Sequence, residues 1–153
     1  MLKLGKLADY ATALMTALAA QPTHVYTTPE LAGLAHIPAT TAAKVLKSLT
    51  RGGLVESQRG VHGGYRLSRN PEQITVADII KAVEGPIAVT ECSTHGGGHC
   101  SIESSCSTRA NWRLINDAIR QALEAVTLAQ MAAPLRRIES PIQFHRATQA
   151  TGH

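Results

Sequence analysis

The sequence predicts a mainly α-helical fold with a small β-hairpin wing, that is, a winged helix-turn-helix followed by a long dimerisation helix. Apolar residues recur with helical periodicity in several separate segments, which is typical of amphipathic helices. A glycine-rich stretch between two short β-type segments follows the third helix and predicts a hairpin. Apolar residues make up 44% of the 153 residues but aromatic residues only 3%, so an aliphatic core is expected.

The first two helices are predicted from apolar spacing and end signals. Residues 6–20 form a helix that Gln21-Pro22 ends. The apolar residues at helical spacing are Leu7, Tyr10, Ala11, Leu14 and Leu18. In the short helix that follows, Thr28 is the predicted N-cap and Pro29 the first helical residue. Its predicted buried residues are Leu31, Ala32 and Leu34.

The third helix has two chemically different sides. Within ATTAAKVLKSLTRGG, residues 39–53, apolar residues recur at i, i+3, i+4 and i+7, and two glycines end the helix. The apolar residues are Ala42, Val45, Leu46 and Leu49. The other side carries Thr40, Thr41, Lys44, Lys47 and Arg51. A helix with such a polar side fits the major groove of DNA, so this segment is the candidate recognition helix.

A hairpin and two further helices are predicted after the recognition helix. Residues 54–67 form the hairpin, with glycines in its turn, and residues 74–85 form a fourth helix. The predicted inward residues of that helix are Val76, Ile79, Ile80 and Val83. Residues 108–133 are predicted to be one long helix with a seam for a second helix. The seam consists of Trp112, Ile115, Ile119, Ala122, Val126, Ala129 and Ala133.

Charge is distributed unevenly along a chain of net charge +4. The first 70 residues carry eight Lys and Arg against three acidic residues, which is typical of a nucleic-acid-binding region. The predicted organisation is a DNA-binding domain (1–85), a cysteine-containing loop (86–107), the dimerisation helix (108–133) and a flexible tail (134–153). Double-stranded DNA is therefore the predicted partner.

Six residues are predicted to contact DNA. Early in the recognition helix, Thr40, Thr41 and Lys44 are placed for base edges, whereas Lys47 and Arg51 are better placed for phosphates. Arg59 precedes a glycine turn, so its guanidinium is a candidate for the minor groove. A second interpretation stays open, in which the two threonines are N-cap residues and the cations form a solvated surface.

Several classes of function are disfavoured. No stretch approaches the roughly 18 consecutive apolar residues of a membrane span, and the start of the chain lacks a secretory apolar run. We therefore expect a cytoplasmic protein that does not act at a membrane. A phosphate-cradling loop, a hydrolase elbow and an HExxH motif are all absent from the sequence, so we do not expect an enzyme.

All three cysteines of the chain lie in one segment rich in glycine and serine, residues 90–106. Cys92, Cys100 and Cys106 are odd in number, and cytoplasmic thiols stay reduced, so a metal centre is favoured over disulfides. Their spacing matches structural zinc sites poorly, because those use Cys-x2-Cys pairs. A zinc site that includes His99, or a thiol redox switch without metal, remains an alternative.

Four segments carry a family resemblance: LKLGKLADYATALMTALA, AKVLKSLTRGGLVESQRGVHGGYRLSR, ITVADIIKAVEGP and RANWRLINDAI. Over about residues 2–133 the chain resembles the bacterial IscR/NsrR family of winged-helix regulators. EGPIAVTEC and the RANWRLINDAI…TLAQM region are similar to regulators of SUF-type iron–sulfur cluster assembly. The resemblance implies a homodimer that binds a palindromic operator, controls cluster-assembly genes and senses a [2Fe–2S] or [4Fe–4S] cluster held by the three cysteines.

The fourth cluster ligand differs between branches of the family. The IscR branch carries a histidine three residues after the last cysteine, where this chain has Arg109, which does not ligate iron. The NsrR branch uses an aspartate of the first helix, supplied by the partner subunit, and Asp9 aligns with it. His95, His99 and Glu103 are rival ligands. Asp9 is alternatively an ordinary surface acid, which the helix dipole favours in a first turn.

Overall fold

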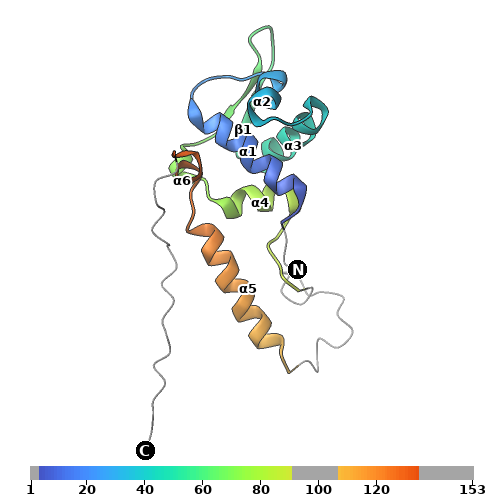
Figure 1. Ribbon diagram of the computed structural model, residues 1–153, viewed down its shortest axis with the longest axis vertical. Helices are drawn as coiled ribbons and strands as arrows, with labels where there is room; N and C mark the ends of the chain where they lie inside the picture. Colours follow the sequence, from blue (N-terminus) through green and yellow to red (C-terminus); the bar gives the residue numbers. More distant parts are fainter. Residues whose placement is uncertain (1–3, 91–106, 135–153) are drawn as a thin grey trace, which may run out of the picture.

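The computed structural model describes residues 4–90 and 107–134 and is mainly helical with one antiparallel hairpin, as predicted (Figure 1). Each predicted helix and strand has a counterpart, although the last predicted helix is divided. The helices are α1 (Lys6–Ala20), α2 (Thr28–Ala35), α3 (Ala39–Arg51), α4 (Val76–Glu84), α5 (Arg109–Glu124) and α6 (Leu128–Ala132). The strands are β1 (Val55–Gln58) and β2 (Gly64–Leu67), and a 3-10 turn, η1 (Pro71–Gln73), precedes α4. Among the described helices, none is long and apolar enough to span a membrane.

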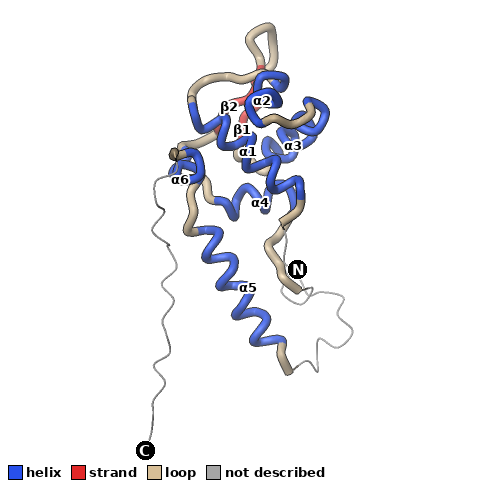
Figure 2. The backbone as a smooth tube through the Cα atoms, viewed as in Figure 1, coloured by secondary structure: helices blue, strands red, loops and turns tan. Residues whose placement is uncertain are grey.

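The core is aliphatic and is built around α1, which packs against α2, α3, α4 and α6 (Figure 2). Helix α1 contributes Leu14, Met15 and Leu18, none more than 1% exposed, to the same cluster as the buried stripe of α3. Tyr26 is the one aromatic residue among the buried residues that the structure describes. Burying each large aliphatic side chain stabilises the fold by roughly 1.5–3 kcal/mol, so this cluster holds the helices together.

Two residues predicted to be buried are exposed. Leu7 lies one position before Ala8, which faces the core, so a rotation of about 100° along the helix turns Leu7 toward solvent. Leu34, at the end of α2, is 56% exposed. It borders a groove of about 620 Å³ where α1 presents small side chains such as Ala13 and Ala17, which leave the leucine uncovered.

Helix α2 begins one residue earlier than predicted, because Thr27 and not Thr28 is its N-cap. The Thr27 hydroxyl accepts a hydrogen bond from the Glu30 backbone N–H at 3.4 Å, and the Thr27 N–H donates to the Glu30 carboxylate at 2.7 Å. This capping box lowers the pKa of Glu30, chiefly through the backbone hydrogen bond. The stabilisation is therefore present at neutral pH and is lost as the pH falls through the folded-state pKa.

The predicted long helix over residues 108–133 is two helices, so its continuous seam was a wrong prediction. Thr127 caps α6 by accepting a hydrogen bond from the Gln130 N–H at 3.2 Å. The chain also pairs with the start of α4, because the Val76 N–H donates to the Val126 carbonyl at 2.9 Å. Leu128, which the predicted seam omitted, is fully buried. These contacts fold α6 back against α1, whereas α5 extends away from the core (Figure 1).

One glycine within α2 and one at the end of α3 allow a matched test of the packing. Gly33→Ala should raise the free energy of unfolding by about 0.5–1 kcal/mol, because alanine favours the helix and an added Cβ meets nothing within 4 Å. Gly52→Ala should lower it by about 1–3 kcal/mol, since the new Cβ would lie 2.7 Å from that of Ala82. Urea unfolding of both variants measures the difference. Equal shifts in the two variants would contradict this packing of α3 on α4.

Candidate functional site

Helix α3 presents one polar side to solvent because its other side is buried. The predicted apolar stripe is confirmed, and its four residues are at most 2% exposed. That burial fixes the rotation of the helix and leaves Lys44, Lys47 and Arg51 exposed. Thr40 is exposed and Thr41 is half-buried. The structure therefore brings all five predicted α3 residues to the surface of one helix.

The start of α3 decides between the two roles considered for its threonines. Pro38 is the N-cap and supplies no side-chain hydrogen bond, so Thr40 and Thr41 lie inside the first turn. The interpretation of these threonines as N-cap residues is therefore wrong. Because no side chain caps the helix, its first backbone N–H groups are available to an anion such as a phosphate.

The wing is a short hairpin whose tip depends on glycine. Gly60 has φ +114°, a backbone conformation that residues with a side chain rarely adopt. A Cβ added to Gly63 would clash with the Gln58 carbonyl oxygen. A Cβ added to Gly64 would likewise clash with the Tyr26 carbonyl oxygen. The tip therefore stays thin, with Arg59 exposed at its start. In Figure 1 this loop projects from the end of the molecule that carries α2 and α3.

Two hydrogen bonds hold the wing to the segment between α1 and α2. The Tyr26 N–H donates to the Tyr65 carbonyl at 2.9 Å, and the Tyr65 N–H donates to the Tyr26 carbonyl at 2.7 Å. The Ser68 hydroxyl also donates to the Gly53 carbonyl at 2.6 Å, which ties the base of the hairpin to the end of α3. These bonds set the position of the wing relative to the segment before α2 and to the end of α3.

The structure distinguishes the cations that form ion pairs from those that do not, a distinction that the sequence alone did not provide. Arg66 donates to the Glu56 carboxylate on the opposite strand at 3.0 and 3.1 Å, and Arg69 lies 3.7 Å from Asp78. Within residues 4–90 and 107–134, the four cations predicted to contact DNA have no ion-pair partner. These four are Lys44, Lys47, Arg51 and Arg59. Their charge is free to neutralise phosphates.

Asp9 is the one predicted metal ligand within the described residues. Its side chain is exposed in the first turn of α1 and has no hydrogen bond or ion pair to another described residue. It borders a cavity of about 630 Å³ between α1, α5 and α6, with Thr12, Leu123 and Met131 among the lining residues. No group of three or more possible metal ligands occurs in the described part of the chain.

The other candidate ligands lie outside the described residues: Cys92, Cys100, Cys106, His95, His99 and Glu103. Their approach to Asp9 therefore stays a prediction. Chemically, three thiolates and one carboxylate can hold an iron–sulfur cluster, with the carboxylate as the weakest ligand. The carboxylate of Asp9 fits that role, because it is exposed and has no partner among the described residues to give up on binding.

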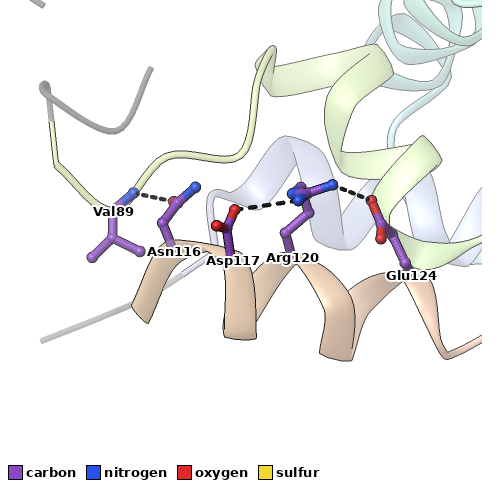
Figure 3. Close-up of polar contacts among 5 residues, drawn as sticks. All are labelled: Val89, Asn116, Asp117, Arg120 and Glu124. Carbon is purple, nitrogen blue, oxygen red and sulfur yellow. Dashed lines mark hydrogen bonds and ion pairs between the residues drawn. The ribbon is translucent and has the colours of Figure 1, made fainter. Parts of the chain in front are cut away.

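Sequence analysis missed Asn116, the one buried polar residue that the structure describes. Its side-chain oxygen accepts a hydrogen bond from the Val89 N–H at 3.1 Å (Figure 3). Residue 89 lies just before the cysteine segment, and Asn116 lies on α5 just after it. The hydrogen bond therefore ties the two ends of that segment together. The only feature of the sequence that indicates this role for Asn116 is a polar residue at an inward position of the helix.

Beyond Asn116, one edge of α5 carries a network of charges. Arg120 contacts Asp117 at 3.2 Å and Glu124 at 3.1 Å, at helical spacings of three and four (Figure 3). Near the start of the helix the apolar side chains are exposed, with Trp112 at 38% and Ile115 at 44%. The described residues of their own domain leave both side chains partly uncovered.

Comparisons with known proteins agree on one kind of protein. The family model Rrf2, described as an iron-dependent transcriptional regulator, matches residues 4–134. Protein aau3 of Rhizobium meliloti is 33% identical over 127 residues, which are 83% of this chain and 82% of aau3. Proteins named NsrR, IscR and CymR also match.

Two solved structures share the fold. The structure of CymR, the global cysteine regulator of B. subtilis, has a TM-score of 0.68 at 29% identity and matches 86% of this chain and 97% of CymR. T. potens IscR has a TM-score of 0.65 at 27% identity and matches 85% of each chain. The winged-helix fold predicted from the sequence is therefore confirmed, and this is an IscR/NsrR-type chain.

Replacement of Asn116 tests the connection between α5 and the cysteine segment. Asn116→Ala should lower the free energy of unfolding by about 1–3 kcal/mol, because the Val89 N–H loses its acceptor in a partly buried place. Amide hydrogen exchange at Val89 should quicken. Asp117→Ala is the control, since an exposed neighbour should change stability by less than about 0.5 kcal/mol. Unchanged exchange at Val89 in Asn116→Ala would remove the anchoring role.

Proposed function

Because the chain belongs to the Rrf2 family of transcriptional regulators, we propose that it senses an iron–sulfur cluster and controls genes for cluster assembly. In this proposal it acts in the cytoplasm as a homodimer, by binding a palindromic operator and not by catalysis. Helix α3 and the wing contact the DNA, and the cysteine segment holds the cluster. Resemblance to the SUF regulators supports the choice of target genes.

One observation carries the DNA-binding part of the proposal. Three cations of α3 and Arg59 of the wing are exposed and have no ion-pair partner among the described residues, whereas Arg66 and Arg69 do. Unpaired cations release the counterions of phosphates without first breaking an internal ion pair. In the proposed complex the first turn of α3 reads bases in the major groove and Arg59 enters the minor groove.

Exposed apolar residues on α5 support the homodimer. Trp112 and Ile115 are 38% and 44% exposed on one side of α5, and an isologous contact between two α5 helices would cover them. A closed twofold dimer presents two recognition helices about 34 Å apart, one turn of DNA, and therefore reads a palindrome. The break after Glu124 limits this contact to α5, because α6 packs on α1.

Cys92, Cys100, Cys106 and Asp9 would hold the cluster, with Asp9 coming from the partner subunit. A bound cluster supplies a redox-sensitive inorganic centre. Asp9 lies on α1, which packs directly against α3, so a ligand bond at Asp9 bears on the helix that positions the recognition helix. The likeness to CymR, a cysteine regulator, means that the shared fold does not by itself specify the signal.

Two matched cation variants test the DNA-binding surface. Lys47→Ala should weaken DNA binding and reduce the slope of log K against log salt by about one per protomer, because one phosphate contact is lost. Arg66→Ala removes the same charge, but Arg66 is held by Glu56, so its slope should stay close to that of the unaltered protein. Fluorescence anisotropy at several salt concentrations measures both. Equal losses in the two variants would indicate overall charge and not a defined surface.

Replacement of Asp9 tests the fourth ligand. Protein reconstituted without oxygen should contain iron and sulfide, and Asp9→Ala should release them to a chelator at least about tenfold faster. Glu72→Ala, an exposed acid on η1, is the control and should behave like the unaltered protein. A colourless protein that contains zinc would favour the zinc alternative, and metal-free protein would favour a thiol switch. Loss of the cluster in His99→Ala but not in Asp9→Ala would assign the ligand to His99.

A further inference from the structure

His36 has an unusual backbone conformation in the turn between α2 and α3. With φ +55° and ψ +41°, it is the one non-glycine residue with positive φ that the structure describes. It ends α2, and its N–H donates to the Gly33 carbonyl at 3.3 Å. Glycine is the usual residue at this place, because a side chain in the left-handed region costs stability. Histidine tolerates the region better than most residues but less well than glycine.

Contacts within the described part of the chain do not compensate for this cost. The side chain of His36 is exposed, so burial does not stabilise it. It makes no hydrogen bond, ion pair or ring contact with another described residue. The next residue, Ile37, packs against the core and donates its N–H to the Ala32 carbonyl at 3.0 Å. The backbone of the turn is therefore held in place, with the imidazole exposed.

That position adjoins the proposed DNA-binding surface. His36 stands four residues before Thr40, at the end of α3 that carries the candidate base-reading residues. In helix-turn-helix proteins the first helix crosses the DNA backbone while the second enters the major groove. The turn that joins the two helices consequently lies at the level of the phosphates. Backbone strain occurs preferentially at functional sites, so the strained conformation of His36 in this turn points to a functional role.

We propose that His36 is a DNA-contacting residue whose imidazole N–H donates a hydrogen bond to a phosphodiester oxygen of the operator backbone. An imidazole ring carries an N–H donor in either of its protonation states. A contact to the backbone positions the protein without reading sequence. The inference rests on the proposed DNA-binding function, and it adds a seventh residue to the surface predicted from the sequence.

The test uses His36→Gly in the full-length protein, with a duplex selected by the unaltered protein from a random-sequence library. His36→Gly should raise the melting temperature by about 2–5 °C, because glycine relieves the positive φ. Its affinity for the selected duplex should fall about three- to tenfold per protomer, the effect of one lost hydrogen bond in each subunit. A variant that folds more stably yet binds more weakly separates a contact from a structural role.

Two variants control for stability and for flexibility of the turn. Gly33→Ala stabilises the same helix by another route, so it should leave DNA affinity unchanged. His36→Ala removes the ring and its N–H donor but keeps a side chain that restricts the turn, and it should weaken binding as much as His36→Gly. If His36→Ala binds like the unaltered protein while His36→Gly does not, turn flexibility explains the loss and the proposed contact is overturned.

Lys47→Ala distinguishes failure of this inference from failure of the proposed function. Normal affinity in His36→Gly together with weaker binding in Lys47→Ala would overturn the His36 contact alone. Normal affinity in both variants would reject the DNA-binding surface, and the contact with it. Selection of no duplex by the unaltered protein would reject the proposed function.

Discussion

The burial of the apolar stripe of α3 against α1 is the constraint on which the rest of the structure depends. An amphipathic helix has only one orientation that buries all of Ala42, Val45, Leu46 and Leu49, and that orientation turns its cations outward. The partner surface is the buried side of α1, which is aliphatic and includes Leu14. Because a close-packed interface tolerates little rotation, the polar side of α3 is held as firmly as the core itself.

The same helix α1 connects the DNA-binding half to the rest of the chain. Helix α6 folds back onto it through the buried Leu128, and backbone hydrogen bonds join the residues before α6 to the start of α4. The C-terminal end of α5 is thereby attached to the DNA-binding half, while Asn116 attaches its N-terminal half to the segment before the cysteines. Any change in the segment that contains the cysteines therefore acts on α5, which is attached to the rest of the chain at both of these places.

Charged side chains have two distinct uses in this fold. Those on the hairpin and on α5 pair across short spacings, such as Arg66 with Glu56 and Arg120 with Asp117. Such exposed pairs contribute little stability, typically below about 1 kcal/mol, but they take the paired cations out of competition for phosphates. The cations of α3 form no ion pair with the described residues, so the electrostatic attraction for DNA concentrates there. Whether its cations are paired with acidic residues, and not how many cations it carries, decides which surface is available to bind phosphates.

Periodicity in the sequence determined the helices, the buried stripe of α3 and the wing, because these depend on local spacing and on glycine. It also identified Thr40, Lys44 and Lys47 as candidate DNA contacts, since an amphipathic helix has one solvated side. The separation of α5 from α6 was decided by tertiary contacts, since hydrogen bonds to residues some fifty positions earlier outweighed a continuous helical pattern. The exposure of Leu34, the burial of Asn116 and the positive φ of His36 likewise depend on what packs beside them. Local sequence encodes the period of an element, but only the assembled chain fixes which neighbours its residues meet.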